Sequence, residues 1–266
     1  MYITIGQYYP SRSFVHSLDP RGKVIFLFLY VIGLFMCRSP LNWCLAVSVL
    51  ALALKLSKVP FRLLLKGLRG VMFLIIFTVV INIFFTKDGA VLLKAGFITI
   101  TDEGLITALR TFLRLCILII MSSVLTLTTT YLALAEAIES FLKPFKRVGL
   151  PAHEIAMMIT IALRFIPTIF DELEKIKLAQ MSRGASFDEG SFVDKAKAMI
   201  PLLIPLFVSA FRTADNLAVA MEARCYRGDI GRTRYRRLVF ERKDYFVMCL
   251  GAVFALIIAL LRFFGM

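Results

Sequence analysis

The sequence lacks the motifs that are typical of ATP-binding sites, metal sites and catalytic sites. No glycine-rich loop is followed by Lys-Ser or Lys-Thr, which excludes the usual phosphate-binding motif of ATPases. The five cysteines form no CxxC pair, and the two histidines, His16 and His153, have no cysteine nearby in the sequence. No Ser/His/Asp set is apparent. We therefore expect no metal site and no bound cofactor, and we find no catalytic set of residues in this chain.

The N-terminus also lacks a basic segment, an apolar segment and a small-residue cleavage site in that order, so we expect no cleaved signal peptide. What the sequence has in excess is apolar residues. Its hydrophobic fraction is 59% and its mean hydropathy is +0.80, against about 45–50% apolar residues in a soluble domain. The net charge of +14 would suggest nucleic acid in a soluble protein. In a membrane protein the same charge is explained by basic cytoplasmic loops, and we favour that explanation.

The apolar residues lie in long runs, which predict an all-α integral membrane protein. Asp19 before Pro20 is typical of a helix start. The polar segment 87–104, which contains a short β-branched stretch, predicts an exposed loop. About five transmembrane helices are expected, four in an N-terminal membrane domain (residues 1–127) and one at the C-terminus (residues 244–266), with apolar runs at residues 24–37, 43–54, 71–86, 105–127 and 245–264.

Residues 128–243 differ, because we find no apolar run there that is long enough to span. Apolar positions recur at helical spacing in 131–146, and Gly149 to Pro151 should end that helix. Two longer helices are expected at 152–183, with a kink at Pro167, and at 192–227, interrupted by Pro201 and Pro205. These helices predict a separate domain outside the bilayer.

Basic residues predict the orientation. Residues 55–69 contain five Lys or Arg and residues 131–243 contain eighteen, whereas the turn 38–42 contains one and the loop 87–104 contains two. Every basic-rich segment falls on the cytoplasmic side if the N-terminus is cytoplasmic. Arg110 and Arg114 lie four apart within the fourth span, and we favour the interpretation that both extend toward the membrane interface.

Two helix ends share a pattern of small residues, an arginine and a glycine. One reads Ala179-Gln180-Met181-Ser182-Arg183-Gly184, and the other reads Ala220-Met221-Glu222-Ala223-Arg224-Cys225-Tyr226-Arg227-Gly228. A glycine after a helix can take the left-handed conformation. Each arginine could serve only the helix dipole. The repetition instead favours a shared task, since a guanidinium at a helix end can bind a carboxylate on a partner.

The chain resembles, nearly end to end, the transmembrane coupling subunit (T component, EcfT/CbiQ-like) of energy-coupling factor transporters, which are ABC-type importers of vitamins and other micronutrients. The resemblance rests on long motifs, which are Ser13-Phe14-Val15-His16-Ser17-Leu18-Asp19-Pro20-Arg21-Gly22-Lys23, Ala162-Leu163-Arg164-Phe165-Ile166-Pro167, Pro201-Leu202-Leu203-Ile204-Pro205 and the two arginine-containing segments. The family has an Ala-Arg-Gly signature at each coupling-helix end. This chain has Ser182 for Ala in the first and Cys225 for Gly in the second, so Gly228 is a possible alternative end for the second helix.

The resemblance implies a non-catalytic subunit with a cytoplasmic coupling domain (residues 128–243). Two partner ABC ATPases, which bind ATP and Mg, would take the helix ends, and a separate substrate-binding membrane protein (the S component) would bind an apolar surface. The implied ATPase-binding residues are Ser182, Arg183, Gly184, Ala223, Arg224 and Cys225. The expected S-component surface lies on the apolar faces of residues 131–146, 155–166 and 199–211. The residues named for it are Leu134, Ile138, Phe141, Leu142, Met157, Met158, Leu203 and Phe207.

Other interpretations stay open at this point. The chain could belong to a dedicated cobalt or nickel system rather than to a module shared by several S components. It could also be a stand-alone membrane enzyme, or a permease that binds its substrate directly. For the acidic cluster Asp171, Glu172 and Glu174, we favour pairing with Lys175 and Lys177, or with the next helix, over a metal or acid–base role.

Overall fold

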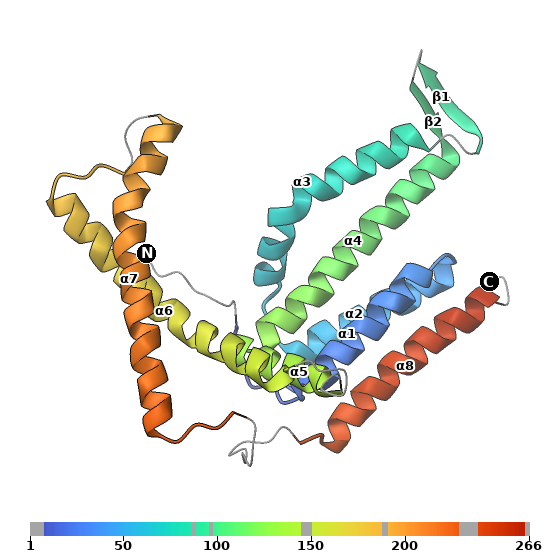
Figure 1. Ribbon diagram of the computed structural model, residues 1–266. Helices are drawn as coiled ribbons and strands as arrows, with labels where there is room; N and C mark the ends of the chain where they lie inside the picture. The colour runs from blue at the N-terminus through green and yellow to red at the C-terminus, as the bar shows by residue number, and fades with distance from the viewer. Residues whose placement is uncertain are drawn as a thin grey trace. The chain divides into compact units, whose positions relative to one another are not determined.

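The computed structural model describes residues 8–86, 89–95, 98–144, 151–187, 191–228 and 239–263. Within these residues the chain is almost entirely helical, which confirms the predicted all-α class (Figure 1). The elements are α1 (Pro20–Met36), α2 (Pro40–Ser57), α3 (Phe61–Phe85), β1 (Val91–Ala95), β2 (Ile98–Thr101), α4 (Asp102–Thr128), α5 (Tyr131–Leu142), α6 (Ala152–Ser182), α7 (Phe192–Ala223) and α8 (Arg242–Phe263).

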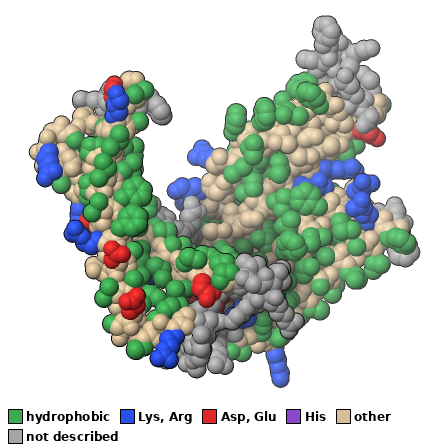
Figure 2. All heavy atoms as spheres, viewed as in Figure 1, with side chains coloured by type: hydrophobic (Ala, Val, Ile, Leu, Met, Phe, Trp, Pro, Cys, Tyr) green, Lys and Arg blue, Asp and Glu red, His purple; other side chains and the backbone are tan. Residues whose placement is uncertain are grey.

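The chain divides into two compact units. The first unit comprises Met1–Leu134 together with Arg237–Met266, and the second comprises Ala135–Arg236. Hydrophobic side chains lie on the surface of both units (Figure 2). This division is structural, and the assignment of the predicted domains to membrane and cytoplasm stays a prediction.

Five of the described helices are long and apolar enough to cross a membrane, namely α2, α3, α4, α7 and α8. The number agrees with the predicted one, but the set differs. Helix α1 has 17 residues, one fewer than the 18 residues taken here as the shortest helix that can span the membrane. Our statement that residues 128–243 contain no segment long enough to span is wrong for α7, because its Pro201 and Pro205 lie inside one continuous helix of 32 residues.

Helices α1 and α8 begin next to each other. Asp19 caps α1 by accepting a hydrogen bond from the Arg21 N–H at 2.9 Å, and Pro20 occupies the first turn, as the sequence predicts. The Asp244 carboxylate at the start of α8 accepts the Asp19 N–H at 2.7 Å. The two helices therefore start from the same end of the first unit and run in the same direction.

Glycines allow α1 and α8 to pack closely. A Cβ atom at Gly33 would lie 2.7 Å from the Phe254 ring, and one at Gly251 would lie 2.9 Å from the Phe26 ring. Tyr30 stacks on Phe254 with ring centroids 5.0 Å apart and donates its hydroxyl to the Ala46 carbonyl of α2 at 2.9 Å. The core of the first unit is thus made by α1, α2, α4 and α8, and its buried members are Tyr30, Leu34, Cys37, Trp43, Ala46, Leu50, Ile117, Met121, Phe254 and Ile258.

The predicted loop between α3 and α4 is wrong in part, because it contains an antiparallel hairpin. Strands β1 and β2 pair with Ala95 opposite Ile98 and Val91 opposite Thr101. Thr101 links the hairpin to both helices, since its hydroxyl donates to the Thr86 carbonyl at 2.9 Å and accepts the Gly104 N–H. The β-branched residues that we assigned to a loop therefore form the strand that leads into α4.

The segment before α1 lies against the end of α4. The Tyr9 N–H donates to the Leu127 carbonyl at 2.9 Å, and His16 Nε2 donates to the Tyr9 carbonyl at 2.9 Å. His16 Nδ1 then accepts from the Ser13 hydroxyl at 2.7 Å. Burial lowers the pKa of His16, because the charged imidazolium would lose hydration. The neutral ring therefore holds this segment in place.

Candidate functional site

The end of α6, which we call the α6 tip (Ser182, Arg183 and Gly184), closes in a Schellman motif. The Gly184 N–H donates to the Met181 carbonyl and the Ala185 N–H donates to the Gln180 carbonyl, both at 3.0 Å. Gly184 has a φ of +88°, where a glycine has no steric penalty. Arg183 is the C-cap residue and is exposed.

The end of α7, the α7 tip (Ala223, Arg224 and Cys225), closes in the same way. The Cys225 N–H donates to the Glu222 carbonyl at 2.8 Å, and the Tyr226 N–H donates to the Met221 carbonyl at 3.1 Å. Arg224 is the C-cap residue and is exposed. Cys225, with a φ of +55°, takes the left-handed position that Gly184 takes in α6.

Cys225, not Gly228, therefore closes α7. Gly228 has a positive φ of its own, at +69°, but lies beyond the cap. A left-handed residue with a Cβ atom costs roughly 1–2 kcal/mol, and the two cap hydrogen bonds offset this cost. The departure from Ala-Arg-Gly leaves the cap geometry intact.

Each arginine therefore stands at the same position relative to its helix end. The last carbonyl groups give each end a partial negative charge, which favours a cation there. Neither guanidinium forms an ion pair with a residue in the described part of the chain. Both groups are thus free, within that part, to bind a carboxylate of another molecule.

Helices α6 and α7 cross within the second unit (Figure 1). Most of the α7 residues that face α6 are small, namely Ser209, Ala210, Thr213 and Ala214, which lets the two backbones approach. The Ser209 hydroxyl donates to Glu172 of α6 at 3.4 Å. The groove between the helices is lined from α6 by Met158, Ile161, Ala162, Phe165, Thr168, Ile169 and Glu172, and from α7 by Leu206, Ser209, Ala210, Thr213, Ala214 and Leu217.

A different side of α7 carries large exposed apolar residues at helical spacing. We call this surface the α7 outer face, and it consists of Ile200, Leu203, Ile204, Phe207, Val208 and Phe211. Phe207 is 61% exposed and Phe211 is 69% exposed. An apolar stripe of this kind on one helix needs a cover, from lipid or from a partner.

The residues predicted to bind an S component divide into two groups. Ile138, Met158, Leu203 and Phe207 are exposed, and Leu203 and Phe207 belong to the α7 outer face. Leu134, Phe141, Leu142 and Met157 are half-buried, and Leu134 belongs to the first unit. From the apolar face expected at 199–211, we named only Leu203 and Phe207, although Ile200, Ile204, Val208 and Phe211 lie on the same face.

The acidic cluster on α6 contacts the next helix through Glu172, which is one of the two predicted pairings, and does not pair with its own lysines. Glu172 accepts the hydroxyl of Ser209, and Lys177 lies over the Phe187 ring with its Nζ atom 6.0 Å from the centroid. Within the described ranges, none of Asp171, Glu172 and Glu174 forms an ion pair with Lys175 or Lys177. The same ranges contain no group of three His, Cys, Asp or Glu side chains that could hold a metal ion.

A buried polar cluster that we did not predict joins three helix ends of the first unit. The Lys23 ammonium donates to the Thr128 carbonyl at 3.0 Å and to the Thr129 hydroxyl at 3.3 Å, at the end of α4. Asp244 accepts the N–H groups of Asp19 and Glu241. Lys23 and Asp244 are 6% and 2% exposed, so the ends of α1, α4 and α8 are fixed together. The only signal in the sequence was charge at the edge of an apolar run.

Arg110 and Arg114 do not behave alike. Arg110 is exposed, whereas Arg114 is half-buried and donates to the Cys37 carbonyl at 3.4 Å. The Arg114 guanidinium also lies over the rings of Phe35 and Trp43. Arg114 therefore contacts residues around the turn that joins α1 and α2, and the extension of both arginines toward the membrane interface stays a prediction.

Comparison with known proteins gives a consistent result. The family described as "Cobalt transport protein" (CbiQ) matches residues 11–235. The energy-coupling factor transporter transmembrane protein EcfT of Ruminiclostridium cellulolyticum is 49% identical over 98% of this chain and 97% of its own length. The proteins of the same name from Acidaminococcus fermentans and Staphylococcus aureus are 46% and 42% identical, and the matches cover 98% and 99% of this chain and 97% and 98% of theirs.

Proposed function

The chain belongs to the family of energy-coupling factor transporter transmembrane proteins, and from that premise we propose that its α6 and α7 tips bind two ABC ATPase subunits. The chain serves as a membrane component of a transporter. It contributes no catalytic chemistry and transmits ATP-driven motion of the ATPases to a separate substrate-binding S component, for uptake of a vitamin or another micronutrient.

The observation that carries this proposal is the equivalence of the two tips. Schellman caps are common, but here both caps also place an exposed arginine at the C-cap position. A planar guanidinium at each end suits a carboxylate in a groove of an ATPase. Two equivalent tips suit two similar subunits, one for each tip.

The first unit supports a cytoplasmic location of the second unit. The end of α4 and the start of α8 lie at one end of the first unit, because Lys23 and Asp244 fix both to the start of α1. The chain between α4 and α8 must then cross the membrane an even number of times. Helix α7 is long and apolar enough to span the membrane. A single crossing by α7 would nevertheless make the number of crossings odd, so it is incompatible with this arrangement. Basic residues favour the cytoplasm for that end.

The α7 outer face is the surface that we assign to the S component. Its apolar residues suit a membrane protein partner, since they lie on a helix that does not cross the bilayer in this arrangement. Helix α7 uses its other side to pack on α6, so the two surfaces are independent. The α5 residue Ile138 and the α6 residue Met158 are exposed candidates for the same contact.

The decisive experiment removes each arginine. Arg183→Ala and Arg224→Ala should weaken retention of the ATPase pair by the tagged chain and reduce ATP-driven uptake, while insertion into the membrane is unchanged. Matched controls are Arg164→Ala and Arg212→Ala, which remove exposed arginines from the bodies of the same helices. Normal ATPase retention and normal uptake in both tip variants would refute the proposal.

A second experiment tests the α7 outer face. Phe207→Ser should release the S component from the complex and leave the ATPases bound, because a central aromatic residue commonly contributes about 2 kcal/mol or more to an interface. Met199→Ser is the control, since Met199 is exposed on another side of α7. Equal loss of the S component in both variants would contradict this assignment.

A further inference from the structure

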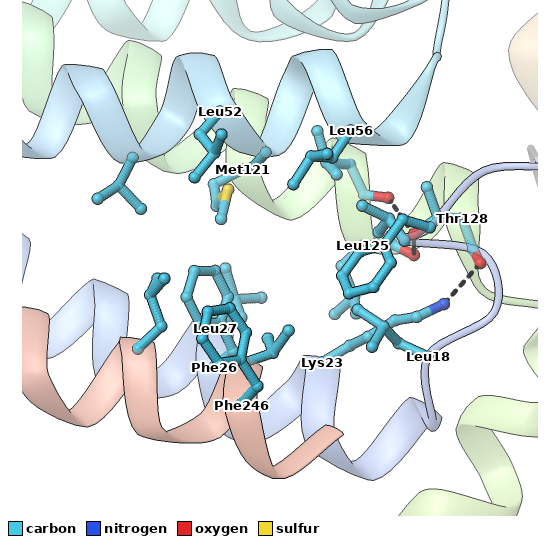
Figure 3. Close-up of a pocket in the computed structure, with 17 residues that line it drawn as sticks. Leu18, Lys23, Phe26, Leu27, Leu52, Leu56, Met121, Leu125, Thr128 and Phe246 are labelled. Atoms are coloured by element: carbon cyan, nitrogen blue, oxygen red, sulfur yellow. Dashed lines mark hydrogen bonds between the residues drawn. The ribbon is translucent and has the colours of Figure 1, made fainter. Parts of the chain in front are cut away.

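The first unit contains a cavity of about 120 Å³ between α1, α2, α4 and α8 (Figure 3). Its walls include Phe26, Leu27, Val49, Leu52, Met121 and Phe246. Ligand pockets for whole small molecules measure roughly 300–1,000 Å³, so this one is too small for a vitamin. It has room for a few methylene groups.

The lining offers almost nothing to a polar ligand. Lys23 contributes its aliphatic stem, while its ammonium points to the Thr128 carbonyl, as the dashed line in Figure 3 shows. The Thr128 hydroxyl is also engaged, because it donates to the Val124 carbonyl at 2.7 Å. An occupant of this cavity must therefore be a hydrocarbon group.

The cavity opens toward the bilayer. Helix α2 packs mainly on α4 and helix α8 packs mainly on α1, so α2 and α8 flank an opening between them. Leu52 and Phe246, on the two sides of this opening, are 47% and 65% exposed. Both side chains belong to helices that are long and apolar enough to span, so the exposed rim faces acyl chains.

Positive charge stands at one end of the opening. Lys55 and Lys58 lie at the end of α2, and Arg242 lies one turn before Phe246 at the start of α8. All three side chains are exposed, and residues three or four apart share a helix face. The other end of the cavity lining, at Leu27, Val49 and Leu250, is apolar. This polarity matches an anionic head group with its chain directed into the cavity.

We infer that this cavity takes a few methylene groups of one acyl chain of an anionic phospholipid, whose head group lies between Lys55 and Arg242. The chain fills the space between α2 and α8, and the phosphate interacts with the basic residues at the opening. This site is separate from the helix tips and from the α7 outer face, so it holds whether or not those surfaces bind the proposed partners.

The test uses the full chain in phosphatidylcholine vesicles that contain a phosphatidylglycerol with a photoreactive diazirine on its acyl chain. After irradiation, mass spectrometry should find adducts concentrated on residues 49–56 and 246–250. Ala53→Phe places a ring in the cavity and should lower this labelling about tenfold, the loss expected when about two methylene groups are no longer buried. Ala51→Phe is the matched control, since Ala51 is exposed on the same helix outside the cavity lining.

Equal labelling of the Ala53→Phe and Ala51→Phe variants would overturn the inference and leave only lipid that surrounds the protein non-specifically. Gel filtration and thermal unfolding check that Ala53→Phe is folded. If it is not, Leu52→Trp, which narrows the opening, should give the same loss of labelling, and unchanged labelling there would overturn the inference equally.

A second arm tests the head group. The wild-type chain should label more with the phosphatidylglycerol probe than with a phosphatidylcholine probe of the same chain. This preference should fall in Lys55→Gln combined with Arg242→Gln, and it should persist in Lys66→Gln, where the exposed lysine is on α3. Equal labelling by both probes in the wild type would contradict the anionic part of the inference.

Discussion

The α6 tip and the α7 tip reach one geometry with different residues. Both ends have an exposed arginine at the C-cap and a pair of Schellman hydrogen bonds. They differ at the next position, where Gly184 fits the left-handed conformation without cost and Cys225 does not. The hydrogen bonds of the helix end therefore define the position of the arginine. A glycine at the next position only lowers the free-energy cost of the left-handed conformation.

Replacing Arg183 or Arg224 should have the largest effect. It tests whether the two tips share one function or have unrelated roles. We expect Arg183→Ala and Arg224→Ala to weaken ATPase docking equally, each by about 2–5 kcal/mol, because each removes one partner of a charged pair. Because the two tips bind separate subunits in our proposal, the losses should add in the double variant. Titration of the purified ATPases against the reconstituted chain measures all three. A loss confined to one variant would break the equivalence of the tips.

A smaller effect is expected when the glycine of the α6 tip is replaced. Gly184→Ala should make this cap resemble that of α7 and cost about 1–2 kcal/mol of local stability, because alanine is strained at a φ of +88°. Hydrogen–deuterium exchange of the last turn of α6 reports this as faster opening, while the last turn of α7 serves as the internal reference. Unchanged exchange in α6 would mean that its cap does not depend on the left-handed residue.

The reverse replacement in the α7 tip should have the smallest effect. Cys225→Gly removes the left-handed strain, but it also restores the larger conformational freedom of glycine in the unfolded chain. The net gain should be about 0.5 kcal/mol, seen as slower exchange in the last turn of α7. Faster exchange would show that the Cys225 side chain makes a stabilising contact that outweighs its strain.

Much of the fold follows directly from the sequence. The helices were predictable because their apolar runs are long and their starts carry recognisable signals, such as Asp19 before Pro20. The hairpin was not, since Thr101 is fixed by bonds to Thr86 and Gly104 that no local pattern reveals. The buried cluster around Lys23 and Asp244 brings together residues more than two hundred positions apart, and one sequence gives no pairing signal for it.

The candidate site was predictable in its residues but not in its geometry. The repeated arginines were visible as a pattern, and the resemblance gave them a role. Cys225 can replace a glycine only if the cap hydrogen bonds offset its backbone strain. The structure answers this question through the φ angle of Cys225 and the hydrogen bonds of the cap. From the apolar face expected at 199–211 we had selected only Leu203 and Phe207, and the exposure of Phe211 shows that it belongs to the same surface.

The native Cys225 offers the most direct test of the proposed ATPase contact, because this exposed thiol lies next to Arg224. A membrane-impermeant maleimide should label Cys225 in the reconstituted chain. The exposed Cys44 and Cys249 should react little, because they lie in helices that are long and apolar enough to span the membrane. Addition of the ATPase pair should then protect Cys225, and Arg224→Ala should abolish that protection. Labelling of Cys225 at an unchanged rate in the assembled complex would contradict the claim that the α7 tip is bound by an ATPase.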